Sequence, residues 1–220
     1  MKQIQYTPMF EMVLDSLRDS IISGVWKPGE LLSHEQIAAR LNVSRMPVRE
    51  AVRLLEQEGF VSVRRNVGVE VLPLSWDDFE EIYLMRQALE SLAGRLATPN
   101  LRDADLDRLR GLLDQMERVL DVAASQPGQT LVLTREFHST IYRPCGRPRL
   151  LKSIDTLRNH SARYRAFVVQ LPGRAKSLLS EHTRIYEACL QRDEDAVADA
   201  IHVHFQQALD IARHEKEMLP

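Results

Sequence analysis

The sequence predicts a mainly α-helical protein with two domains: a small N-terminal domain that ends in a β-hairpin, and a larger domain made only of helices. Three observations lead to this prediction. Most segments repeat apolar residues with a helical period, residues 60–71 alternate apolar and polar residues as strands do, and Pro73 separates the two patterns. We therefore expect domains at residues 1–72 and 76–220, joined by a linker at residues 73–75.

The composition is that of a folded protein with no general affinity for nucleic acid. Of the 220 residues 44% are hydrophobic, and the formal net charge is −2. Between Arg40 and Arg65, however, six arginines stand against three glutamates, so positive charge is concentrated locally. The two cysteines, Cys145 and Cys189, follow no pairing pattern. With no signal-peptide core or long apolar run, these features predict a cytoplasmic protein that does not enter a membrane.

Three helices are expected in the N-terminal domain before the hairpin. Thr7 caps the first helix, which ends before Gly24. The second helix opens at Ser33, and Gln36 stands three residues later with the spacing of a capping box. Ser44 is predicted to cap the third helix. The buried stripe of that helix is expected to contain Val48, Ala51, Val52 and Leu55.

This order of elements is the outline of a winged helix-turn-helix, in which the last helix enters the DNA major groove and nearby cations hold phosphates. Arg45, Arg49 and Arg53 follow one another at successive turns of the third helix, beside its buried stripe. They form a basic ridge. The alternative is a solvated face whose arginines pair with glutamates of the same helix and the turn after it. Those glutamates are Glu50, Glu56 and Glu58.

The N-terminal domain also resembles the DNA-binding domain of GntR-type bacterial transcription regulators, over about residues 8–72. The resemblance is carried by P-G-E-L-L-S, by I-A-A-R-L-N-V-S-R-M-P-V-R-E-A-V-R-L-L-E-Q-E-G-F-V and by N-V-G-V-E-V. It implies DNA contacts from the third helix and from the hairpin tip. The candidate DNA-binding residues are Ser44, Arg45, Met46, Arg49, Arg53, Arg65, Asn66 and Gly68.

Two residues depart from the family pattern. Met46 stands where threonine is usual, and Val67 stands where a wing arginine is common. Methionine offers an apolar contact instead of a hydroxyl, so Met46 is expected to change the operator sequence and not to abolish binding.

Six helices are predicted in the second domain, separated by proline, glycine and polar breaks. Their ranges are 76–97, 101–124, 128–143, 147–170, 173–192 and 194–214. Ser75 and Asp78 have capping-box spacing at the first of them. His138, His182 and His204 fall on the apolar stripes of three different helices. One inward histidine is most often a core residue bonded to a hydroxyl or carbonyl, but three around one cavity would form a site for zinc or a related divalent ion.

The second domain resembles the FCD effector domain of the FadR-type GntR branch, through E-F-H-S-T-I, S-E-H-T-R-I and I-H-V-H-F-Q-Q-A. Six helices are typical of its shorter, VanR-like variety. The resemblance implies a divalent metal (Zn, Ni or Mn) held by an aspartate and three histidines at positions 134, 138, 182 and 204. This chain has Thr134 in place of the aspartate. A neutral hydroxyl is a poorer ligand than a carboxylate, which leaves open whether a metal is bound.

Arg86 is predicted to be a further inward polar residue. It shares a stripe with apolar residues, where a cation is costly unless it is paired. Its partner is either Glu90, one turn later, or the carboxylate of an effector, as the resemblance implies for an arginine of this helix. Arg158, Arg163 and Arg165 could line the same cavity, or Arg158 and Arg165, which are seven residues apart, could belong to a solvated face.

Together these features predict a homodimeric transcription regulator, in the first instance a repressor, that binds a palindromic double-stranded DNA operator and responds to a small organic acid. Two alternatives remain. In one the metal ion itself is the signal. In the other the protein is a metal-dependent hydrolase, which needs a general base beside the metal. Glu136, the nearest acid in sequence, falls off the inward stripe, so no enzyme is expected.

Overall fold

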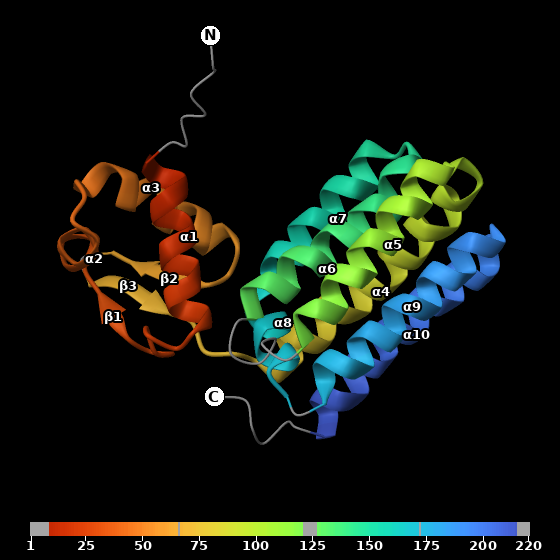
Figure 1. The fold of residues 1–220 in the computed structure, drawn as a ribbon. Helices are drawn as coiled ribbons and strands as arrows, with labels where there is room; N and C mark the ends of the chain where they lie inside the picture. The colour runs from red at the N-terminus through yellow and green to blue at the C-terminus, as the bar shows by residue number, and fades with distance from the viewer. Residues whose placement is uncertain (1–8, 66, 121–126, 172, 215–220) are drawn as a thin grey trace, which may run out of the picture. The chain divides into compact units, whose positions relative to one another are not determined.

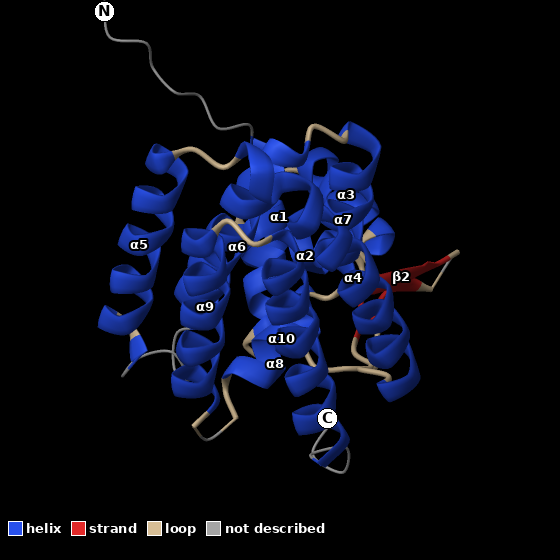
Figure 2. Ribbon diagram, turned by 90° about the vertical axis from the view of Figure 1, so that its right-hand side faces the viewer, coloured by secondary structure: helices blue, strands red, loops and turns tan. Residues whose placement is uncertain are grey.

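The computed structural model describes residues 9–65, 67–120, 127–171 and 173–214. The chain divides into two compact units, an N-terminal unit that ends at Leu74 and a C-terminal unit that begins at Ser75 (Figure 1). Within the described residues, helices predominate and the strands form one small sheet (Figure 2). The predicted fold class, mainly α with a small β-hairpin, is confirmed.

The N-terminal unit contains the three predicted helices and the hairpin. Its elements are α1 (Met9–Ile22), β1 (Leu31–Leu32), α2 (His34–Leu41), α3 (Arg45–Gln57), β2 (Val61–Arg64) and β3 (Gly68–Val71). The sheet is antiparallel with the order β1-β3-β2, and Val61 pairs with Val71. The sequence did not predict β1, because two residues are too few to show a strand pattern. Thr7, the expected first cap, lies outside the described residues.

Local hydrogen bonds explain how α2 and α3 begin. At α2 the Ser33 hydroxyl accepts from the Gln36 backbone N–H at 3.1 Å, and the Gln36 side chain accepts from the Ser33 N–H at 2.8 Å, which completes the predicted capping box. Asn42 ends α2 in a left-handed conformation, with φ 52°. Ser44 takes the N-cap position of α3, but its side chain makes no capping hydrogen bond. The predicted N-cap position of Ser44 is therefore confirmed, but the capping hydrogen bond expected of its side chain is not formed.

The C-terminal unit is a helical bundle (Figure 1). Its helices are α4 (Trp76–Ala97), α5 (Asp103–Arg118), α6 (Pro127–Tyr142), α7 (Pro148–His160), α8 (Ala162–Val169), α9 (Arg174–Gln191) and α10 (Glu194–His214), with short 3-10 turns η1 (Thr98–Asn100) and η3 (Arg143–Cys145). Helix α4 packs along α10, where the side chain of Ile201 occupies the space that a Cβ on Gly94 would need. No helix of the described residues has the length and apolarity to cross a bilayer.

The predicted helix 147–170 is two helices, so the described part of this unit has seven α-helices where six were predicted. The break lies at Ser161, whose hydroxyl donates to the Arg158 carbonyl at 3.0 Å and accepts from Arg86 Nη1 at 3.1 Å. No proline or glycine marks this position. The break coincides with a buried contact to another helix, which the local sequence does not reveal.

Candidate functional site

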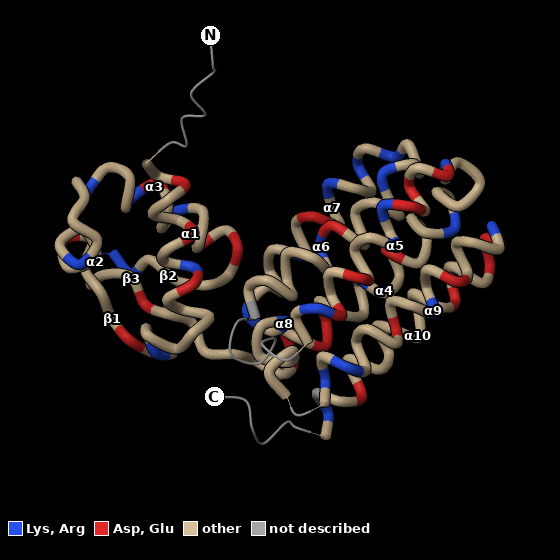
Figure 3. Tube along the Cα trace, in the orientation of Figure 1, with Lys and Arg blue, Asp and Glu red and all other residues tan. Residues whose placement is uncertain are grey.

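The basic ridge lies on the exposed face of α3. Ser44, Arg45, Met46, Arg49 and Arg53 are all exposed, while the predicted apolar stripe of the same helix is buried. Figure 3 shows the lysine and arginine positions of the N-terminal unit in blue. The surface therefore presents a hydroxyl, a thioether and three guanidinium groups side by side.

Two of the three glutamates that could neutralise this ridge have other partners. Glu58 binds Arg18 at 2.9 Å, and the Glu56 carboxylate accepts from the Val63 backbone N–H at 2.7 Å. Arg45 pairs with Glu35 of α2 at 2.9 Å, but both side chains are exposed, so the pair is weak. Within the described residues no ion pair holds Arg49 or Arg53. The ridge is therefore largely free to bind an anionic partner.

The hairpin of β2 and β3 carries the second group of candidate DNA-binding residues. Arg65 is exposed at its turn, and Asn66 lies outside the described residues. Gly68 has φ +140°, and a Cβ at this position would lie 2.8 Å from the Leu32 carbonyl oxygen. Glycine is therefore required here by the close approach of β1 and β3, whatever contact the residue makes with DNA.

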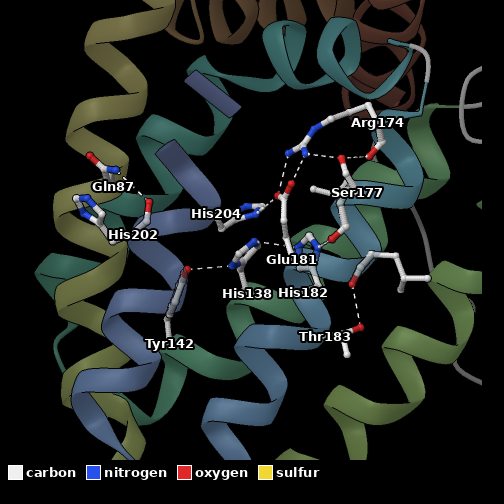
Figure 4. Close-up of polar contacts among 12 residues, drawn as sticks. Gln87, His138, Tyr142, Arg174, Ser177, Glu181, His182, Thr183, His202 and His204 are labelled. Atoms are coloured by element: carbon white, nitrogen blue, oxygen red, sulfur yellow. Dashed lines mark hydrogen bonds and ion pairs between the residues drawn. The ribbon is translucent and has the colours of Figure 1, made fainter. Parts of the chain in front are cut away.

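Three buried histidines converge inside the C-terminal unit, one each from α6, α9 and α10 (Figure 4). His138 and His182 approach with their Nε2 atoms 3.2 Å apart, and each histidine offers a ring nitrogen within 4.8 Å of the other two. Nitrogen ligands about 2.0–2.1 Å from one tetrahedral zinc ion lie about 3.3–3.4 Å apart. The separation of the His138 and His182 Nε2 atoms fits two ligands of one divalent ion, and His204 offers a third nitrogen within 4.8 Å of both rings.

Hydrogen bonds orient each of the three rings through Nδ1. His182 donates to the Leu178 carbonyl at 2.7 Å, and His204 donates to a Glu181 carboxylate oxygen at 2.7 Å. His138 Nδ1 lies 2.9 Å from the Tyr142 hydroxyl, which can accept as well as donate. With Nδ1 protonated, each ring keeps the Nε2 lone pair for a metal.

Burial and the neighbouring charges keep these groups in the states that a metal needs. Burial lowers the pKa of His138 well below its usual value and the pKa of His182 to about 3, so both rings are neutral at neutral pH. Burial alone would raise the pKa of Glu181, but hydrogen bonds from His204 and Arg174 lower it to about 2. Glu181 is thus a carboxylate, and it orients the His204 ring through Nδ1.

The fourth position of the family's metal set, Thr134, lines the same cavity. Its hydroxyl oxygen is buried and has no hydrogen-bond partner among the described residues. The space open to the centre of a water-sized sphere is about 40 Å³, and one water needs about 10–15 Å³ by this measure. The cavity therefore has room for a small ligand beside the histidines.

Arg86 makes the first of its two predicted contacts, the ion pair with Glu90, and it also lines the cavity. Its Nε donates to Glu90 at 2.8 Å, its guanidinium lies 4.8 Å from the Phe205 ring centre, and it still lines the cavity. The solvated-face alternative for Arg158 and Arg165 is wrong, because Arg158 is 1% exposed and Arg165 lines the cavity with buried guanidinium nitrogens. Helix packing, which the seven-residue spacing could not reveal, encloses both.

The sequence analysis missed two residues that support the site. Arg174 and Glu181 form a bidentate, buried ion pair on α9, and Glu181 also holds His204. A signal was present, since an arginine and a glutamate seven residues apart lie on one face of a helix. A second signal is that Glu181 directly precedes His182, one of the candidate metal ligands.

Comparison with known protein families agrees with this geometry. The FCD domain model matches residues 81–207, more than half of the chain, and the model for bacterial regulatory proteins of the gntR family matches residues 10–71. The chain belongs to the GntR family of bacterial regulatory proteins. It is a transcriptional regulator with a GntR-type helix-turn-helix domain and an FCD domain.

Relatives of this GntR regulator are also named as transcriptional regulators. The Nta operon transcriptional regulator of Aminobacter aminovorans is 32% identical over 197 residues, which cover 87% of this chain and 90% of that protein. The HTH-type transcriptional repressor RspR of Escherichia coli is 26% identical over 210 residues, with 96% and 91% covered. Both names describe transcriptional regulators, and neither describes an enzyme.

Solved structures share the fold. The structure of Escherichia coli McbR/YncC has a TM-score of 0.79 at 23% identity and covers 96% of this chain and 100% of its own. A GntR transcriptional regulator from Rhodococcus sp. RHA1 has a TM-score of 0.71 at 24% identity, with 94% and 99% covered. At these identities the likeness establishes the fold alone.

Proposed function

We propose that this GntR regulator is a homodimeric repressor whose FCD domain binds a small organic acid with the help of a divalent metal, and that the acid changes its affinity for a palindromic operator. The observation that carries the proposal is the convergence of three histidine nitrogens beside a cavity that arginine side chains also line. Relatives named as repressors, such as RspR, support repression over activation.

In this proposal α3 enters the major groove. Arg49, Arg45 and Arg53 bind guanine edges or phosphates, since a guanidinium fork matches both. The Ser44 hydroxyl makes no capping bond, so it is available to a phosphate, and Met46 is 63% exposed for contact with a thymine methyl. Arg65, Asn66 and Gly68 of the hairpin reach the adjacent minor groove.

The metal ligands are the Nε2 atoms of His138, His182 and His204, with the ion being Zn, Ni or Mn. When bound, the ion supplies a positive centre for a carboxylate oxygen of the acid. Glu181 and the Leu178 carbonyl hold two of the rings in place. Thr134 adds a hydroxyl where the family has a carboxylate, so the site has one negative charge fewer to hold the ion.

The homodimer is supported by an exposed apolar stripe on α4. Leu84, Ala88 and Leu92 follow one another at successive turns and are exposed, and Met85 lies beside them. An apolar stripe of this kind suits a second copy of the chain across a two-fold axis. The acid acts by binding one dimer geometry more tightly than the other, which is typically worth about 1–3 kcal/mol.

The two alternatives are less well supported. A regulator that senses the metal itself gains affinity from an anionic ligand, and Thr134 removes that ligand. A hydrolase needs a free base beside the metal, but the Glu181 carboxylate is held by Arg174 and His204. The Glu136 carboxylate binds Arg108 at 2.7 Å and is not among the residues that line the cavity.

Metal analysis of tag-free protein, followed by a thermal-shift screen of small carboxylates with and without the ion found, tests the proposal. His204→Ala and His202→Ala form a matched pair on α10, because His204 is buried in the cluster and His202 is exposed. We expect added zinc or nickel to stabilise the wild type and His202→Ala, by about 2.7 kcal/mol at 100 times the dissociation constant. His204→Ala should lose this response.

Equal metal responses of the two variants would place the metal elsewhere and contradict the proposed site. If no carboxylate raises the melting temperature of the metal-loaded wild type, the acid-binding part of the proposal is wrong.

A further inference from the structure

Five buried polar atoms around the cavity have no hydrogen-bond partner among the described residues. They are the hydroxyl oxygens of Thr130 and Thr134, the Nε and Nη1 atoms of Arg165, and the Nε atom of Arg174. Buried polar groups in folded proteins are almost always hydrogen-bonded, because an unmade bond costs the full desolvation of the group. Their convergence on one cavity indicates a ligand with several hydrogen-bond acceptors.

The charges around the cavity are also unbalanced. Arg86 is paired with Glu90, and Arg174 is paired with Glu181. Arg158 and Arg165 have no ion pair with any described carboxylate, and burial keeps His138 and His182 neutral by lowering the pKa of each ring. The interior thus carries two guanidinium charges more than it carries carboxylates, in a place where an unpaired charge is costly.

Arg165 is the unpaired cation that faces the ligand space. It lines the cavity, its Nη2 donates to the Arg158 carbonyl at 3.1 Å, and its other two nitrogens are buried without a partner. Burial and the nearby cations Arg86 and Arg158 lower the pKa of Arg165 to about 9. An anion at this position would accept the missing hydrogen bonds of Arg165 and would reduce its repulsion by Arg86 and Arg158.

We propose that the effector is a dianion, a short dicarboxylate that places one carboxylate at the three histidines and the other on Arg165. This inference rests on the proposed function, because it specifies the acid. Apolar side chains that line the same cavity, among them Leu131, Val168 and Phe205, suit the hydrocarbon part of such a ligand. The small cavity favours an acid of about two to four carbons.

Calorimetric titration of the metal-loaded wild type with matched acids tests the inference. Oxalate, malonate and succinate are compared with their monoamides oxamate, malonamate and succinamate, which keep the length and lose one charge. We expect the best dicarboxylate to bind about tenfold or more tightly than its monoamide, as loss of a charge-assisted hydrogen bond predicts.

A substitution of Arg165 tests whether this residue binds the second carboxylate of the acid. Arg165→Gln should reduce the affinity for the dicarboxylate to about that for the monoamide and leave the affinity for the monoamide unchanged. The control is Arg135→Gln on α6, where an exposed arginine outside the cavity lies 3.8 Å from Asp155. This control should bind as the wild type does.

The outcomes separate the two proposals. Equal affinities for a dicarboxylate and its monoamide, in the wild type, would overturn the dianion and leave the acid-binding function standing. The same conclusion would follow if Arg165→Gln bound both acids as the wild type does. If no acid of either series binds, both proposals fall. Should Arg165→Gln not fold, the wild-type comparison of acid and amide still decides.

Discussion

The arginines of α3 and the arginines inside the C-terminal unit stand in opposite environments. Arg49 and Arg53 are exposed, so water satisfies them and their lack of an ion pair costs little. Arg86 and Arg158 are 3% and 1% exposed, and each must be satisfied by a protein group or a ligand. An unpaired cation is therefore weak evidence of a binding partner on the surface and strong evidence in the interior.

The largest effect is expected where an interior cation loses its carboxylate. Glu90→Gln keeps the shape of the side chain and removes the charge that pairs with Arg86 at 2.8 Å. Because Glu90 is fully buried, we expect the free energy of unfolding, measured by urea denaturation, to fall by about 3–5 kcal/mol.

The matched surface change is Asp114→Asn, which breaks the exposed pair of Asp114 and Arg110 on α5. It should cost about 0.5 kcal/mol or less. A loss below about 1 kcal/mol for Glu90→Gln would remove the energetic difference between the two environments on which the comparison depends.

A smaller effect is expected from a substitution in the exposed ridge of α3. It should change the affinity for DNA and leave the stability of the protein unchanged. Arg49→Ala should weaken binding to an operator selected from random double-stranded DNA by about 1–3 kcal/mol, roughly 5- to 150-fold. Fluorescence anisotropy measures the loss, and the melting temperature should stay unchanged. Arg118→Ala, an exposed arginine at the end of α5, serves as the control. Equal losses for both variants would contradict a specific role for α3.

The smallest effect is a pH dependence that separates buried from exposed histidines. In metal-free protein the pKa of His182 is about 3, against 6.5 for an ordinary histidine. Between these values the unfolded chain binds a proton that the folded chain does not. Stability therefore falls as the pH decreases below about 6.5, by up to about 1.4 kcal/mol per pH unit for this group, and is unaffected above it.

Urea denaturation in EDTA at pH 7 and pH 5.5 measures this dependence. His182→Asn should lose less stability on acidification than the wild type, while His202→Asn, at an exposed position, should behave as the wild type does. A wild-type pH dependence in His182→Asn would show that His182 is not held neutral by burial.

The sequence by itself determined the elements and the faces of most helices. The capping box at Ser33, the apolar stripe of α3 and the inward direction of His138, His182 and His204 all follow from local spacing. Helical period and capping depend on residues within one or two turns, so a single chain reveals them. The resemblance to the GntR family rests on the same local motifs.

Only the tertiary structure decided which of these faces meet. The break at Ser161, the pairing of Glu181 with His204 and the enclosure of Arg165 depend on contacts between helices far apart in the chain. Spacing places a side chain on a face, but the packing of that face determines whether a cation there lies beside a carboxylate, in water or at a cavity. The proposed ligand of this protein rests on that packing, because burial is what makes an unpaired charge costly.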